Sequence, residues 1–99
     1  MIYNLFAWGE NHKVEIRKSS YVTNGNLALS LWEINEGPYA TLTVNLDETL
    51  PMNQAYVDTN NCAWAETFIH KNKLGVHTGK FKVSGFCAYP LYEFNLENL

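Results

Sequence analysis

The sequence contains no lysine or arginine between Lys18 and Lys71, although acidic residues recur along that stretch. The formal net charge at pH 7 is −3, and the pattern inverts between Lys71 and Lys82, which holds lysines and no acid. Because an acidic surface repels phosphate, this distribution argues against direct nucleic-acid binding. The acids of the cation-free stretch are either ordinary solvated charges or a face that docks on a basic protein partner, and we expect the second. They are Glu33, Glu36, Asp47, Glu48, Asp58 and Glu66.

Cysteine is also scarce, with only Cys62 and Cys87 in 99 residues. The N-terminal residues lack the basic and apolar regions of a signal peptide. No run approaches the roughly 18 apolar residues that cross a membrane. We therefore expect a protein of the bacterial cytoplasm with reduced thiols and no membrane association.

Closely spaced pairs of metal ligands are missing as well. The cysteines and histidines of the second half, Cys62, His70, His77 and Cys87, are 8, 7 and 10 residues apart, too far for the usual paired zinc motifs. The run from Asp58 begins like a calcium loop, but Ala63 stands where such a loop has glycine and Ile69 where it has glutamate. We expect no metal and no cofactor.

The composition is that of one folded domain, residues 1–99, with 46% hydrophobic and 14% aromatic residues. Alternation of apolar and polar residues predicts an N-terminal meander over 2–8, 13–17, 27–31 and 39–46, with shorter strands near 55–57, 80–84 and 89–96. In segment 39–46 it places Ala40, Leu42, Val44 and Leu46 inward and Thr41, Thr43 and Asn45 outward. Asn24–Gly25 predicts a type I′ hairpin turn, and Pro90 predicts an edge or a bulge.

One helix is expected over about residues 61–72. Trp64, Ala65, Phe68 and Ile69 fall on one helical face, and Asn60 and Asn61 are residue types that cap a helix. The predicted fold is therefore α+β, an antiparallel sheet of about five to six strands with this helix packed on one face. The helical face should meet Leu27, Leu29, Leu31, Leu42 and Val44 in the core.

The turn before this helix is the densest candidate site, formed by Asp58, Asn60, Asn61 and Cys62. A thiol at a helix N-terminus ionises readily, which suggests a cysteine-dependent enzyme with His70 or His77 as its base. Against this, His70 would lie about 12 Å along the same helix. Packing or capping is the alternative role for Cys62, and we expect no catalytic residues.

Aromatic residues gather near the C-terminus, at Phe86, Tyr89, Tyr92 and Phe94. Core packing is the ordinary explanation for aromatics in a strand. A homo-oligomer in which this strand pairs edge to edge with a second copy is the alternative.

Four segments, Asn24 to Ala28, Pro38 to Leu46, Val57 to Glu66 and Ser84 to Tyr92, resemble a family of small uncharacterised domains of unknown function. The resemblance covers about residues 20–96. It implies an accessory protein encoded on conjugative elements, plasmids or phages of gut bacteria, and it transfers no catalytic residue. Proteins of this kind include inhibitors of host defence nucleases such as CRISPR nucleases. We therefore expect a non-enzymatic protein that acts by binding another protein.

Overall fold

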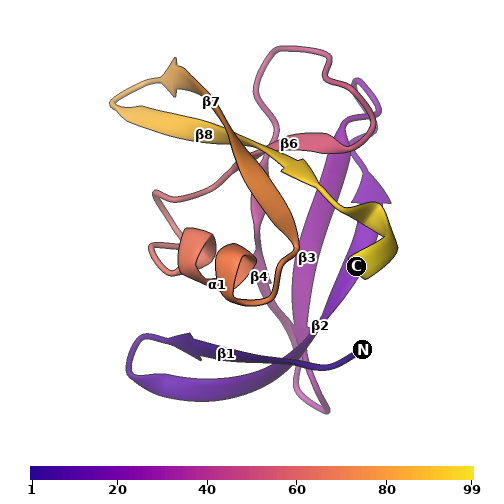
Figure 1. Ribbon diagram of the computed structural model, residues 1–99, viewed down its shortest axis with the longest axis vertical. Helices are drawn as coiled ribbons and strands as arrows, with labels where there is room; N and C mark the ends of the chain where they lie inside the picture. Colours follow the sequence, from indigo (N-terminus) through magenta and orange to yellow (C-terminus); the bar gives the residue numbers. More distant parts are fainter.

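Two four-stranded antiparallel sheets and one short helix make up the computed structural model, which describes residues 1–99 (Figure 1). Sheet A has the order β1-β2-β3-β4 and sheet B the order β5-β6-β8-β7. The elements are β1 (Tyr3–Ala7), β2 (Glu10–Ser20), β3 (Leu27–Glu33), β4 (Gly37–Thr41), β5 (Thr43–Val44), β6 (Gln54–Val57), α1 (Ala65–Lys71), β7 (Gly75–Ser84), β8 (Cys87–Phe94) and the 3₁₀ turn η1 (Leu96–Asn98). The α+β class is confirmed, but the expected strand number is wrong, because eight strands divide between two sheets.

The chain passes from sheet A to sheet B at Leu42, which explains the second sheet. The Leu42 N–H donates to the Leu29 carbonyl of β3 at 2.8 Å, while the Leu42 carbonyl accepts from Asp58 N–H, just past β6, at 2.9 Å. The single strand predicted over 39–46 is therefore two strands, β4 and β5. Thr43, predicted to face outward, is buried, and its Oγ1 accepts a hydrogen bond from Leu29 N–H at 3.2 Å.

The type I′ turn lies in the β1–β2 hairpin rather than at Asn24–Gly25. Trp8 and Gly9 form a two-residue turn in which both have positive φ, +48° and +81°. At Asn24–Gly25 the β2–β3 connection is longer, and of these two residues only Gly25 has a positive φ. The longer loop lets the side chain of Asn26 reach the β5–β6 loop, where its amide donates to the Glu48 carbonyl at 2.7 Å.

The C-terminal strand β8 is internal to sheet B, between β6 and β7. Pro90 lies opposite Phe81, beside a register irregularity in β7, and β6 pairs with β8 only from Leu91 onward. At Pro90 the strand therefore has a neighbour only in β7, and the missing N–H of proline breaks no ladder bond with β6. This is the local edge that the sequence predicted, and the irregularity lies opposite it, in β7. Cys87–Pro90 of β8 pair only with β7 and keep one unpaired side, so the pairing of two copies that the sequence suggested stays a prediction.

The helix is shorter than expected, Ala65–Lys71 instead of about 61–72. Trp64 is its N-cap and makes no side-chain capping bond. The preceding residues form a separate turn, in which Cys62 N–H donates to the Asp58 carbonyl at 2.9 Å and Asn61 N–H donates to Asp58 Oδ1 at 3.2 Å. Because the backbone N–H groups of Asn61 and Cys62 bond to Asp58, these two residues belong to this turn and not to the first turn of the helix. No helix in the structure combines the length and apolar character needed to cross a membrane.

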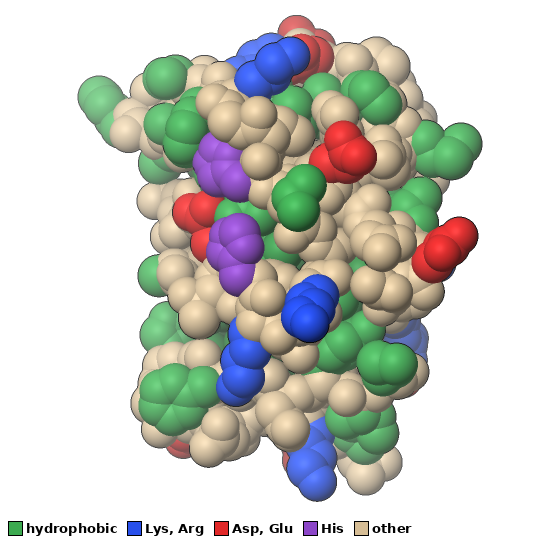
Figure 2. Space-filling model, in the orientation of Figure 1, with side chains coloured by type: hydrophobic (Ala, Val, Ile, Leu, Met, Phe, Trp, Pro, Cys, Tyr) green, Lys and Arg blue, Asp and Glu red, His purple; other side chains and the backbone are tan.

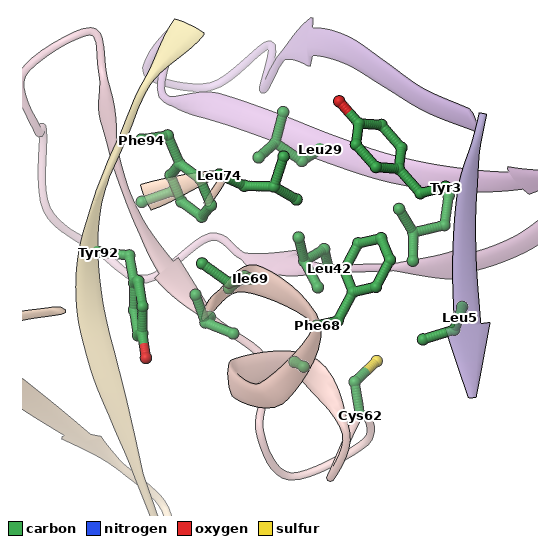
Figure 3. Close-up of a cluster of buried hydrophobic side chains, with 14 of the residues drawn as sticks. Tyr3, Leu5, Leu29, Leu42, Cys62, Phe68, Ile69, Leu74, Tyr92 and Phe94 are labelled. Atoms are coloured by element: carbon green, nitrogen blue, oxygen red, sulfur yellow. The ribbon is translucent and has the colours of Figure 1, made fainter. Parts of the chain in front are cut away.

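The core lies between the two sheets and the helix, as Figure 3 shows. Ala65, Phe68 and Ile69 are buried on α1, as the helical period predicted, and they join Leu27, Leu29, Leu31 and Leu42 in one cluster. Val44 is only half-buried and lies outside it. The helix lies between β1 and the β7–β8 hairpin (Figure 1), with its Phe68 ring 6.0 Å from that of Tyr3.

Candidate functional site

The six acids predicted to form one docking face are dispersed. Glu48 lies near Asn26, at the start of β3, whereas Glu33 ends that strand. At about 3.3 Å per residue, seven residues of strand separate the two by about 20 Å. In the view of Figure 2 the acidic side chains lie singly among hydrophobic and basic ones. The acids that follow one another in the sequence therefore do not form one acidic face in the structure.

Four of the six acids also have partners inside the molecule. Glu33 contacts His12 at 2.6 Å, Glu66 accepts from the Tyr92 hydroxyl at 2.5 Å, Asp58 binds Asn61, and Glu48 binds both Lys82, at 3.3 Å, and Tyr56, at 2.6 Å. Glu36 and Asp47 are exposed in turns and make no ion pair. Most of these carboxylates therefore already hold the fold together.

An aromatic cluster marks a different surface, at the end of sheet A where the β1–β2 turn lies. Its three rings are Trp8, Tyr39 and Trp64, from the turn, from β4 and from the residue before α1. Ring centroids are 5.9 Å apart for Trp8–Tyr39, 5.8 Å for Trp8–Trp64 and 6.3 Å for Tyr39–Trp64. Segments far apart in the sequence thus build one aromatic surface.

Trp8 is an unusual residue for its position. The first central residue of a type I′ turn needs positive φ, which favours asparagine, aspartate or glycine. Here a tryptophan adopts φ +48° and still leaves 66% of its surface exposed. A large aromatic side chain that is strained and solvent-exposed contributes little to folding, and such outliers are grounds for a functional hypothesis.

Carboxylates border the aromatic cluster. His12 Nδ1 lies 2.6 Å from Glu33 Oε2, and His12 Nε2 lies 3.2 Å from the Tyr39 hydroxyl and 3.8 Å from Glu10 Oε2. The side chain of Glu10 is 77% exposed. Burial, followed by the charges of Glu33, Glu10 and Cys62, raises the pKa of Tyr39. Two carboxylates, with His12 between them, therefore border the aromatic rings.

We call Trp8, Tyr39, Trp64, Glu10 and Glu33 the acidic–aromatic patch. No lysine or arginine makes an ion pair with either carboxylate. Exposed indole and carboxylate together suit a guanidinium or ammonium group, which stacks on the ring face and pairs with the acid.

The surroundings of Cys62 do not favour the cysteine chemistry that the sequence suggested as an alternative. Cys62 lies three residues before α1 and is only 3% exposed, and its side chain points into the core with Leu5 and Phe68 (Figure 3). Burial, with the nearby charge of Asp58, raises the pKa of its thiol to about 11, opposite to the lowering that a nucleophile needs. Sγ instead donates a weak hydrogen bond to the Thr41 carbonyl at 3.6 Å. Asp58, Asn60 and Asn61 form the turn above it.

A second polar cluster joins the helix to sheet B. The hydroxyl of Tyr92, a fully buried residue, donates to Glu66 Oε2 and lies 2.9 Å from His70 Nε2. Burial, reinforced by the hydrogen bond to Glu66, raises the pKa of Tyr92. Because this hydroxyl is inaccessible to a substrate and has both partners, the cluster anchors α1 on β8. No group of three or more His, Cys, Asp or Glu residues is placed to hold a metal ion.

A second exposed apolar group lies on the β7–β8 hairpin, at Phe81, Val83 and Phe86. Lys80 and Lys82 alternate with Phe81 and Val83 along β7 and therefore lie on the other face of the strand, where Lys82 pairs with Glu48.

The sequence analysis missed Trp8, Glu10 and Tyr39 of the patch, and the His12 that contacts its carboxylates, and it assigned Trp64 only to the core. The signal that could have found the first was local, since a Trp-Gly pair between two alternating segments places tryptophan in a turn position that disfavours it. The others come together only through strand register, with Ala7 opposite Glu10 and Leu5 opposite His12.

Comparison with known proteins gives one relationship. No curated protein sequence and no solved structure matches the chain significantly. Residues 15–99 match a family model described as "Domain of unknown function (DUF4313)", and the chain belongs to that family.

Proposed function

We propose that this protein is a non-enzymatic binding protein that docks on a basic surface of another protein through the acidic–aromatic patch. The observation that carries the proposal is Trp8, an exposed tryptophan held at positive φ two residues before Glu10, whose side chain is 77% exposed. Tryptophan is enriched among the few residues that dominate binding energy at protein interfaces.

The charges of the patch set the kind of partner. Glu10 and Glu33 favour approach of a positively charged surface and speed the encounter at low ionic strength. The Trp8 ring then supplies contact area and a face on which an arginine stacks. This docking should weaken as salt is added, because Glu10 is exposed to screening ions.

We further propose the biological setting that the sequence resemblance implies, an accessory protein of a bacterial mobile element in the cytoplasm. A defence nuclease is the partner class that fits, because nucleases that bind nucleic acid carry basic grooves. The acidic–aromatic patch would occupy such a groove, and the protein itself would bind no nucleic acid.

The test is affinity capture from the native bacterial lysate with three matched baits. The baits are the unaltered protein, Trp8→Ala and Phe86→Ala. The last bait removes an aromatic residue of the β7–β8 hairpin that is even more exposed than Trp8. We expect a protein that is retained by the first and third baits, is lost with Trp8→Ala and elutes at high salt. Equal retention by all three baits, or loss only with Phe86→Ala, would contradict the proposal.

A further inference from the structure

The strand that leads to Trp8 has a free edge. β1 is the outermost strand of sheet A. Ala7 and Glu10 flank the two-residue turn, so this pair exchanges hydrogen bonds, and so does the pair of Leu5 with His12, two residues further on. The backbone N–H and C=O groups of Asn4 and Phe6 therefore point away from β2. None of the hydrogen bonds that loops, turns and caps make involves them.

A small cavity lies along this edge, between β1 and the helix. Its volume is about 270 Å³, and its lining includes Leu5 and Phe6 from β1 with Trp64, Phe68 and Lys71 from the opposite side. This volume is below the roughly 300 Å³ at which small-molecule sites begin, and it suits a single large apolar side chain.

The cavity is continuous with the acidic–aromatic patch. Trp64 belongs to both, since it lines the cavity and its ring contacts that of Trp8. The Nε1–H of Trp64 is also the one buried side-chain polar group without a hydrogen-bond partner.

We propose that the partner docks by adding an extended segment antiparallel to β1, which deepens the proposed function and rests on it. Addition of a strand to a free edge supplies main-chain hydrogen bonds, and pockets for alternate side chains supply specificity. Here the outward groups of Asn4 and Phe6 pair with the segment, and one of its apolar side chains fills the cavity.

The direction of the strands fixes the order of residues in the segment. β1 runs toward Trp8, so an antiparallel segment meets Trp8 and Glu10 first and the cavity later. Residues two and four positions before the apolar residue share its face of the sheet. An arginine there reaches the patch, whereas Lys71 disfavours a cation at the cavity. The recognised pattern is therefore arginine followed, two or four residues later, by a large apolar residue.

Synthetic peptides test this inference on the intact protein. The probe is a blocked ten-residue peptide of alternating threonine and valine with one arginine and, four residues later, one leucine. Control peptides reverse that order or replace the leucine with aspartate. Phe6→Pro removes one outward N–H without touching the β1–β2 ladder, and Phe6→Ala keeps that N–H. Dissociation constants are measured by fluorescence anisotropy.

We expect the probe to bind the unaltered protein, and to bind Phe6→Ala more weakly because the Phe6 side chain lines the cavity. Phe6→Pro should lose at least a further tenfold in affinity relative to Phe6→Ala, and each control peptide should lose at least tenfold on the unaltered protein. The amides of Asn4 and Phe6 should also become protected from hydrogen exchange when the probe binds. This second measurement uses the unaltered chain and so remains decisive if Phe6→Pro fails to fold.

Two results would overturn strand addition. One is an absence of binding by every peptide at millimolar concentration. The other is binding that survives Phe6→Pro and leaves both amides unprotected. Either result leaves docking through the patch intact if the Trp8→Ala bait still loses its partner, so failure of this inference is distinguishable from failure of the proposed function.

Discussion

Replacing Trp8 by asparagine should leave the fold nearly as stable as before while removing the docking surface. Holding an ordinary residue in the left-handed backbone conformation costs roughly 1–2 kcal/mol. Asparagine adopts this conformation readily, so the substitution should recover that cost. The indole is 66% exposed, so only about a third of its surface is buried. That third is about 50–80 Å² of the 150–250 Å² an aromatic can bury, or about 1–2 kcal/mol. The two effects offset each other.

Urea unfolding followed by far-UV circular dichroism measures the difference. We expect Trp8→Asn to change the free energy of unfolding by less than about 1 kcal/mol. The control is Phe68→Ala, at a residue only 3% exposed, which should cost about 3–5 kcal/mol. A loss near 3 kcal/mol for Trp8→Asn would show that Trp8 holds the core together, and the argument for docking from its exposure and strain would fail.

Three further predictions concern the polar and thiol groups. Tyr92→Phe removes the buried hydroxyl that donates to Glu66 and should cost about 1–3 kcal/mol in urea unfolding, so an unchanged midpoint would contradict the anchoring role. Hydrogen bonds from Tyr56 and then from Lys82 lower the pKa of the Glu48 carboxyl below its ordinary value of 4.5. The ionised carboxylate therefore stabilises the folded protein above pH 4.5, and this stabilisation is lost as the pH falls through the lowered pKa. The stability gap between the unaltered protein and Glu48→Gln should accordingly shrink in acid, and a gap that widened there would refute the assignment. The Cys62 thiol, with a pKa raised to about 11, should react with a disulfide reagent far more slowly than a free thiol at pH 7, and modification at the free rate would show it to be accessible.

The helix illustrates what local sequence can predict. Its apolar period placed Ala65, Phe68 and Ile69 on the buried face, because that period is a property of the segment alone. Its start was predicted four residues too early, since Asn61 is a good cap by type but its side chain bonds to Asp58, with 2.9 Å between Nδ2 and Oδ2, and not to the helix. The capping propensity of a residue does not show whether its side chain will bond to the helix or to the turn that precedes it.

The division into two sheets and the site depend on contacts that the sequence does not display. Alternation over 39–46 is continuous, and only the bonds of Leu42 to both β3 and Asp58 show that the strand changes sheets there. Likewise, Glu10 and Glu33 become neighbours through His12, across strand pairs whose register no local pattern determines. The predicted acids were grouped by their nearness in sequence, which a meander of strands does not preserve in space.

Site-specific photocrosslinking in cells tests the central claim most directly. A benzophenone side chain is placed at position 8 in one variant and at position 86 in another, so that both exposed aromatic positions are sampled. Docking through the acidic–aromatic patch predicts one discrete protein adduct from position 8, absent from position 86 and abolished when Glu10→Lys is added. Adducts from position 86 alone, or position-8 adducts unchanged by Glu10→Lys, would contradict it.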